Sequence, residues 1–146
     1  MNEQLHIENQ LCFRLYKLNK SLTKLYAPLL KQLGLTYPQY LVMLVLWQHN
    51  AAISVKSIGK QLELDSGTLS PLLKRMEKLN LVMRSRNKND ERSVSIELTA
   101  HGKEIKNKAK NIPATLFMLT GLSKAELISL QHTLDALLEN THQHIP

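Results

Sequence analysis

The spacing of apolar residues changes from helical to alternating between residues 54 and 98, and this change limits the folds open to the chain. Ser54 can cap a short helix that ends near Leu62, and Asp65 or Ser66 can cap a second helix after a short turn. Two helices joined in this way predict a helix-turn-helix. The second helix has these apolar residues at helical spacing: Leu69, Leu72, Leu73, Met76 and Leu79.

Pro71 complicates the second of these helices. A proline inside a helix removes a backbone donor and crowds the carbonyl group four residues earlier, which here belongs to Gly67. A shorter alternative makes Ser70 the N-cap and Pro71 the first helical residue. We prefer the longer helix, because glycine at position 67 allows local relief.

A two-stranded hairpin is expected directly after these helices. Val94, Ile96 and Leu98 alternate with polar residues, which predicts a half-buried strand. Residues 81–86 are expected to pair with this strand, and the polar, turn-prone segment 87–91 joins the two. A charged hairpin in this position is a wing.

Leucine-rich helices are expected on both sides of this region. Apolar residues at helical spacing predict a long helix over 11–29, with Pro28 near its end and Gly34 as a stop signal. Thr36 fits the N-cap of a second, very apolar helix over 38–48, with proline in its first turn.

The C-terminal part is also expected to be helical. Thr99 can cap a helix that begins near Ala100 and is interrupted or bent around Pro113. Ser123 and Glu126 form a capping box ahead of a final leucine-rich helix. Unless the terminal helices pack on each other within one subunit, their apolar faces predict a symmetric dimer.

Positive charge is concentrated in the middle of the chain. The formal net charge is +7, and Lys and Arg outnumber Asp and Glu by 13 to 7 between residues 56 and 110. Total charge alone can reflect a solvated surface, but a basic helix-turn-helix indicates double-stranded DNA as the partner. We therefore expect one mainly α-helical domain over 1–146, with a winged helix-turn-helix DNA-binding region at 38–110 and dimerisation helices at 1–35 and 111–146.

Composition and motifs argue against other classes. A single cysteine cannot form an internal disulfide, no signal sequence precedes a cleavage site, and no apolar run approaches the ~18 residues of a membrane span. A cytoplasmic location without a membrane partner is expected. Neither a phosphate-binding G-x-x-x-x-G-K-[ST] loop nor H-E-x-x-H occurs, and the histidines indicate no metal site, so we expect no cofactor and no enzyme activity.

The chain resembles the MarR family of winged helix-turn-helix repressors, and within it the one-cysteine branch that regulates resistance to organic hydroperoxides. The resemblance runs from Gln10 to about His142 and implies a homodimer that binds an operator with inverted repeats and releases it when its cysteine is oxidised. Four blocks in the right order carry it: LCF at 11–13, TYPQYL at 36–41, DSGTLSPLLKRME at 65–77 and DERSVSIELTAHG at 90–102.

The second helix of the helix-turn-helix is expected to present its first turns to base edges in the major groove, while flanking cations neutralise phosphates. In the family, the wing tip inserts an arginine into the minor groove beside an aspartate, and Arg92 and Asp90 match those positions. A solvated charged hairpin is the alternative. The predicted DNA-contacting residues are Asp65, Ser66, Thr68, Ser70, Lys74, Arg75, Arg84, Arg86, Lys88, Asp90 and Arg92.

Cys12 has two interpretations. From the residues alone, it is more simply a small buried apolar side chain. The resemblance instead implies peroxide sensing, in which tyrosine hydroxyl groups stabilise the reactive thiolate. Oxidation would give a sulfenic acid, and the absence of a second cysteine favours a mixed disulfide with a low-molecular-weight thiol over a backbone sulfenamide or over-oxidation.

The tyrosines of the resembling regulators act across the dimer, at positions matching Tyr26 and Tyr37. Tyr26 follows Cys12 by 14 residues, or about 21 Å along an unbroken helix, so either the helix breaks or the partner subunit supplies the tyrosine. Tyr16, one turn from Cys12, is expected to pack at the same site. Arg14 is expected to face solvent or to tune the thiol.

Three other functions fit parts of the sequence. A thiol peroxidase would need a resolving cysteine that the sequence lacks. An aromatic ligand could control a MarR-type repressor from a cleft near Tyr37, Tyr40 and Trp47, with Cys12 structural, although a core role suits each aromatic residue better. Constitutive DNA binding is the third. Release by hydroperoxide, by a ligand or by neither would distinguish them.

Overall fold

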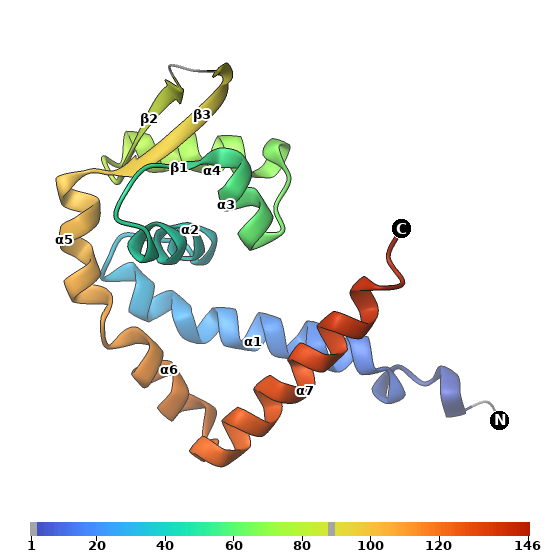
Figure 1. Ribbon diagram of the computed structural model, residues 1–146. Helices are drawn as coiled ribbons and strands as arrows, with labels where there is room; N and C mark the ends of the chain where they lie inside the picture. The colour runs from blue at the N-terminus through green and yellow to red at the C-terminus, as the bar shows by residue number, and fades with distance from the viewer. Residues whose placement is uncertain (1–2, 88–89) are drawn as a thin grey trace. The chain divides into compact units, whose positions relative to one another are not determined.

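The computed structural model describes residues 3–87 and 90–146 and contains two compact units. The first unit runs from Met1 to Lys110, and the second runs from Asn111 to Pro146. The first unit holds the long first helix, the helix-turn-helix and the wing (Figure 1).

The first unit begins with two short 3-10 turns, η1 (Glu3–Leu5) and η2 (Ile7–Asn9), and with helix α1 (Leu11–Lys31). α1 is continuous, although Pro28 lies near its end. After it, Gly34 adopts a left-handed φ of 70°, a conformation that glycine allows without steric cost. The predicted helix and its stop signal are therefore confirmed.

Three further helices carry the caps that the sequence predicts. The side chains of Thr36, Ser54 and Asp65 each accept a hydrogen bond from a first-turn backbone N–H, which satisfies a donor that the helix itself leaves unpaired. The helix capped by Asp65 continues through Pro71, so the longer of the two alternatives for this helix is confirmed. Their bounds are α2 (Tyr37–Gln48), α3 (Val55–Leu62) and α4 (Ser66–Lys78).

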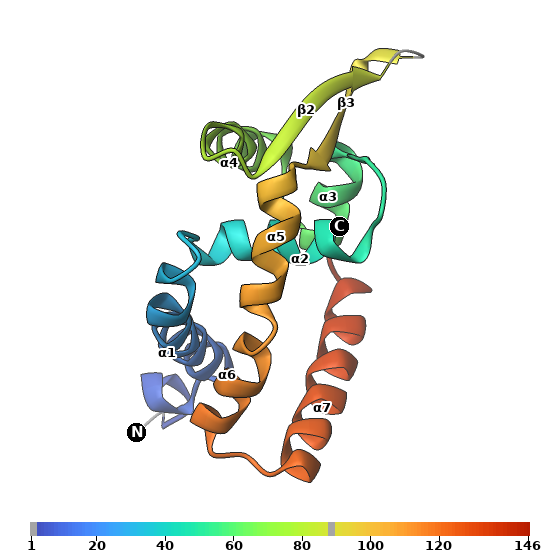
Figure 2. The same cartoon turned by 90° about the vertical axis from the view of Figure 1, so that its left-hand side faces the viewer.

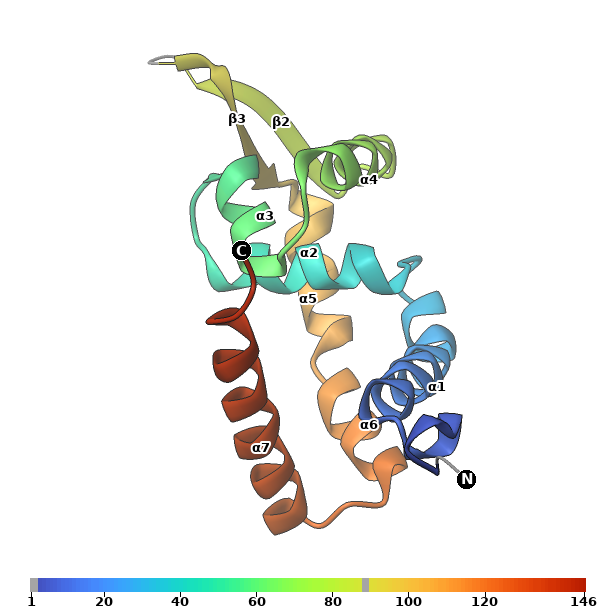
Figure 3. The same ribbon diagram turned by 90° about the vertical axis from the view of Figure 1, so that its right-hand side faces the viewer.

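The wing is an antiparallel hairpin of β2 (Val82–Asn87) and β3 (Asp90–Leu98). The sequence analysis did not predict β1 (Ile53–Ser54), which pairs with the other edge of β3 and gives a sheet of order β1-β3-β2. The hairpin extends well beyond α3 and α4 in Figures 1 and 3. We refer to α3, α4 and this hairpin together as the reading head.

Helix α5 (Ala100–Ala109) follows β3 and passes α2 (Figure 2). Thr99 caps it, as predicted, by accepting a hydrogen bond from the N–H of Gly102 at 2.9 Å. The core of the first unit joins α1 and α2 to the reading head, and its most completely buried side chains are Leu30, Val42, Met43, Leu46, Ile58, Leu69, Leu73, Met76, Val82 and Ile96.

The second unit contains α6 (Ile112–Thr120) and α7 (Lys124–His142). Pro113 lies in the first turn of α6, so the predicted interruption of the helix near this residue is confirmed. Ser123 and Glu126 form the predicted capping box of α7. Throughout the described residues, no helix combines the length and the apolar character that a membrane span requires.

Candidate nucleic-acid interface and thiol site

The N-terminal turn of α4 is fixed by Asp65. Its carboxylate accepts a hydrogen bond from the backbone N–H of Thr68 at 2.7 Å, and this bond is the main cause that holds the pKa of Asp65 below its usual value. Asp65 was predicted among the DNA-contacting residues, and the structure gives its carboxylate the additional task of capping the helix. The cap holds the first turn of α4 in a defined conformation.

One side of α4 is buried and the other is open to a partner. Leu69, Leu72, Leu73 and Met76 pack into the core, which fixes the rotation of the helix about its axis. The predicted contact residues lie away from this buried stripe, with Ser70 half-buried and these side chains exposed: Ser66, Thr68, Lys74 and Arg75.

The wing is connected to α4 through Arg84. Its Nε lies 3.4 Å from Oε1 of Glu77, and its backbone N–H donates to Oε2 of the same carboxylate at 3.2 Å. Arg86 and Arg92 are exposed, as a DNA contact requires. Lys88 and the side chain of Asp90 lie outside the described residues.

A groove of about 710 Å³ lies between α3, the start of α4 and the wing. Arg84 and Arg92 line it from the wing, and Lys56 and Lys60 line it from α3. Sequence analysis missed these two lysines, although their spacing of four residues in a predicted helix signals a shared face. Together they make the groove a surface where phosphates can bind, with Glu63 and Asp65 as its acidic residues.

Cys12 is exposed and is the second residue of α1. The expected burial of Cys12 is therefore wrong for the isolated chain: the apolar stripe of α1 is not covered there, since Leu11 is 57% exposed and Leu18 is 45% exposed. Arg14 is exposed and faces solvent.

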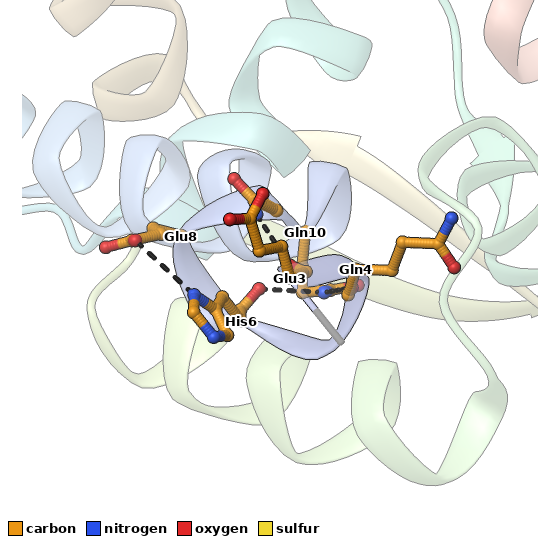
Figure 4. A network of polar contacts seen from close by, with 6 residues as sticks. Glu3, Gln4, His6, Glu8 and Gln10 are labelled. Atoms are coloured by element: carbon orange, nitrogen blue, oxygen red, sulfur yellow. Dashed lines mark hydrogen bonds and ion pairs between the residues drawn. The ribbon is translucent and has the colours of Figure 1, made fainter. Parts of the chain in front are cut away.

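The N-terminal turns fold back on the residue that precedes α1 (Figure 4). The side-chain amide of Gln10 donates to the carbonyl oxygens of Gln4 at 2.7 Å and His6 at 2.9 Å. Gln10 occupies the N-cap position of α1, but its side chain accepts no hydrogen bond from the first turn of the helix. Its amide thus anchors the segment directly before Cys12.

Tyr26 and Tyr37 lie together, 4.9 Å apart between ring centroids. Both are half-buried, and burial is the main cause that raises the pKa of Tyr26 to about 12, with contributions from Tyr37 and Tyr40. Burial likewise raises the pKa of Tyr40. The Tyr26 phenol therefore stays protonated, and able to donate a hydrogen bond, throughout the physiological pH range.

Cys12 does not share a site with these tyrosines within one chain. α1 is unbroken from Leu11 to Lys31, so Cys12 and Tyr26 lie about 21 Å apart along its axis. Of the two possibilities that the sequence leaves open, a break in the helix is therefore excluded. Tyr16 lies on the same helix, is 60% exposed and carries the ammonium group of Lys20 over its ring at 5.0 Å.

The aromatic residues considered for a ligand cleft do not line one common cavity. Tyr37 lines a cavity of about 500 Å³ with residues of α1, whereas Trp47 lines a separate cavity of about 270 Å³ beside α5. Tyr40 is only 2% exposed and packs in the core. Within the described segments, no group of three or more His, Cys, Asp or Glu residues is placed to hold a metal ion.

Comparison with known proteins identifies the family of the chain. The family model of the transcriptional regulators SarA and Rot matches residues 24–109. The organic hydroperoxide resistance transcriptional regulator of Bacillus subtilis (strain 168) is 50% identical over 141 residues, which cover 97% of this chain and 95% of that protein. These relatives are transcriptional regulators, which agrees with the expectation that the chain is not an enzyme.

Solved structures extend the match to the fold. Overoxidised AbfR, a Staphylococcus epidermidis protein, is bound to DNA in a crystal structure that aligns over 98% of both chains with 34% identity and a TM-score of 0.78. A mutant MarR from E. coli in complex with operator DNA aligns over 85% of this chain and 90% of its own, with 26% identity and a TM-score of 0.78. The chain therefore belongs to the MarR/SarA family of winged helix-turn-helix transcriptional regulators.

Proposed function

We propose that the chain is a homodimeric repressor that binds an inverted-repeat operator and releases it when organic hydroperoxide oxidises Cys12. The name of the Bacillus subtilis relative, at 50% identity, supports the response to organic hydroperoxide. The DNA-bound structures of AbfR and MarR support operator binding. The exposure of Cys12 in the first turn of α1 carries the sensing part of the proposal.

In the proposed complex, α4 enters the major groove and the wing reaches the adjacent minor groove. Ser66, Thr68 and Ser70 contact base edges or phosphates from the early turns, and Lys74 and Arg75 contact the backbone or a guanine edge. Arg92 enters the minor groove. A two-fold dimer places two α4 helices about 34 Å apart, or a multiple of this distance, which matches successive major grooves.

The apolar surfaces of the helices support a dimer. The residues 1–35 and 111–146 are proposed as its helices, and the isolated chain leaves large apolar side chains of both segments exposed. Their burial against a second copy would be driven by the hydrophobic effect. The exposed apolar residues of these segments include Leu5, Ile7, Leu11, Leu18, Met118, Leu119, Ile128, Leu130, Leu138 and Ile145.

Tyr26 and Tyr37 of one subunit are proposed to hydrogen-bond the Cys12 thiolate of the other, with Tyr16 packing beside it. The continuous α1 supports this arrangement, because it keeps Cys12 away from Tyr26 of the same chain. The pKa of Tyr26, about 12, leaves its hydroxyl group able to donate. A hydrogen bond to a charged sulfur contributes about 1.5–3 kcal/mol, which favours the thiolate over the thiol.

The proposed chemistry has two steps. The thiolate of Cys12 attacks the terminal peroxide oxygen, the O–O bond breaks, and after proton transfer the products are a sulfenic acid and an alcohol. A low-molecular-weight thiol then displaces hydroxide from the sulfenic acid, which forms a mixed disulfide and water. Because the chain has one cysteine, the thiol must come from outside it.

A peroxide titration of the wild type and a Cys12→Ser variant tests this proposal. An operator duplex is first selected from random sequences with reduced protein, and binding is then followed by fluorescence anisotropy as cumene hydroperoxide and a small thiol are added. The wild type should release the duplex and Cys12→Ser should retain it. Equal release by both proteins would contradict sensing by Cys12 but leave DNA binding intact.

Mass spectrometry of the treated protein tests the product. Wild-type protein should gain the mass of one added thiol less two hydrogen atoms, and reduction should reverse the gain. A stable gain of two or three oxygen atoms instead would show over-oxidation, which would contradict the mixed-disulfide step.

A further inference from the structure

Four aromatic rings form a continuous path inside the first unit. The ring centroids of Tyr37 and Tyr26 are 4.9 Å apart, those of Tyr26 and Tyr40 are 5.7 Å apart, and those of Tyr40 and Trp47 are 6.3 Å apart. Each separation lies within the range of about 4.5–7 Å in which aromatic pairs interact. The path leads from the two tyrosines proposed to face the thiol to the only tryptophan of the chain.

Trp47 is attached to α5 by two directional contacts. Its indole Nε1 donates a hydrogen bond to the carbonyl oxygen of Gly102 at 3.0 Å, and its own carbonyl oxygen accepts one from Nζ of Lys106 at 3.1 Å. The side chain is 8% exposed. A displacement of this indole therefore has to move α5 or break a buried hydrogen bond.

Gly102 lies at the junction between α5 and the reading head. Its N–H donates to Oγ1 of Thr99 at 2.9 Å, and that hydroxyl group lies 2.6 Å from the carbonyl oxygen of Asn80. The N–H of Thr99 also donates to the carbonyl oxygen of Leu81 at 3.1 Å. Residues 80 and 81 connect α4 to β2, so this junction joins the recognition helix, the wing and α5.

We infer that Trp47 is a positioning residue that couples the state of the tyrosine pair to the orientation of the reading head, through Tyr40 on one side and Gly102 on the other. The inference rests on the proposed function, since it names the route by which oxidation at one end changes DNA binding at the other. Trp47 also lines a cavity of about 270 Å³ beside α5, so its coupling to α5 depends on directional contacts rather than on close packing alone. The indole N–H adds direction, because it has one acceptor on a different helix.

Gly102 also brings the backbone of α5 close to the connection between α4 and β2. A Cβ atom at this position would overlap the carbonyl oxygen of Leu81 and lie 3.1 Å from the Leu98 side chain. The backbones of α5 and the α4–β2 connection therefore touch without a side chain between them. A shift of α5 at Gly102 passes directly to the start of the wing.

A Trp47→Phe variant tests the inference, because phenylalanine keeps an aromatic ring but has no N–H for Gly102. For wild type and variant, operator affinity is measured with Cys12 reduced and with Cys12 fully converted to its mixed disulfide, as confirmed by mass. We expect similar Cys12 oxidation rates in the two proteins and a reduced-to-oxidised affinity ratio about tenfold smaller in Trp47→Phe, the scale of one neutral hydrogen bond.

Met43→Leu provides the matched control, because Met43 is a fully buried residue of α2 outside the ring path and the substitution nearly conserves volume. This variant should keep the wild-type ratio. Equal ratios in wild type and Trp47→Phe would overturn the inference while leaving the proposed function intact. A wild type that keeps its operator affinity after complete oxidation would overturn both.

Fluorescence gives a second measurement that needs no variant of Trp47. Trp47 is the only tryptophan, so emission of the DNA-free wild type reports on this residue alone. Conversion of Cys12 to the mixed disulfide should shift the emission maximum or its intensity, and a Cys12→Ser protein under the same treatment should show no change. Unchanged emission after complete conversion of the wild type would overturn the inference.

Discussion

The carboxylate of Asp65 accepts the backbone N–H of Thr68 at 2.7 Å and so caps the first turn of the helix proposed to read DNA. The same contact holds the pKa of Asp65 below its usual value. A carboxyl group with a lowered pKa stabilises the folded state above its unfolded pKa, and that stabilisation is lost as the pH falls through the lowered folded value.

The first prediction concerns this cap. Asp65→Ala should lower the thermal midpoint at pH 7, and the difference from wild type should narrow as the pH is lowered past the pKa of Asp65, where the wild-type cap is itself protonated. Asp65→Asn is the control, because asparagine also caps helices but does not titrate. Thermal unfolding followed by circular dichroism at pH 7, 5 and 3 checks this. If the midpoints of wild type and Asp65→Ala differ equally at all three pH values, the stabilisation does not come from the ionised carboxylate of Asp65.

The second prediction concerns the α3 lysines in the groove. Lys60→Ala should weaken binding to any duplex and reduce the slope of log affinity against log salt by about one per subunit, as expected when one phosphate contact is lost. Lys108→Ala, an exposed lysine of α5 outside the groove, should change neither. Anisotropy titrations from low to physiological salt measure both slopes, and equal slopes for Lys60→Ala and wild type would remove α3 from the interface.

The third prediction compares two glycines of the helix-turn-helix. Alanine usually stabilises a helix relative to glycine by about 1 kcal/mol. At Gly59 the new Cβ would lie 2.7 Å from the carbonyl oxygen of Leu64, so Gly59→Ala should instead lower the free energy of unfolding by about 1–3 kcal/mol. At Gly67 the nearest atom is the Asp65 carboxylate at 3.4 Å, so Gly67→Ala should be neutral or stabilising. Urea unfolding of both variants checks the opposite signs.

The fourth prediction follows from the proposed thiolate partners. Tyr26→Phe removes a phenol that stays protonated up to a pKa of about 12, so at neutral pH Cys12 should react about tenfold more slowly with iodoacetamide and with cumene hydroperoxide. Alkylation and peroxide-oxidation rates of the wild type and the variant at pH 7 measure the loss. Tyr16→Phe, which alters an exposed ring, should have a smaller effect, and equal effects would argue against a special role of Tyr26.

Local signals made most of the fold predictable. The caps at Thr36, Ser54, Asp65, Thr99 and Ser123 each depend on residues within one helical turn, and all five are present in the structure. The family resemblance then placed these helices in a winged helix-turn-helix, which the family match confirms. Features that depend on neighbouring residues, such as helix caps, were therefore predicted correctly.

Features that depend on distant residues were missed. β1 has two residues, and its pairing of Ile53 with Ile96 bridges segments that no local pattern relates. The exposure of Cys12 was not evident either, because an apolar stripe predicts burial but not whether the same chain supplies the covering surface. The shared groove of Lys56 and Lys60 with the wing arginines could not be predicted, because it depends on where the wing lies relative to α3.

The unbroken α1 has a consequence for the amount of working sensor in a cell. Cys12 and Tyr26 lie far apart on one continuous helix. A single copy therefore contains both residues of the proposed thiolate site but cannot bring them together. Two copies paired as proposed would complete two sites at once, so under mass action the responsive fraction would rise with protein concentration. Dilution below the dissociation constant of the proposed pair would separate each Cys12 from the tyrosines of the other copy.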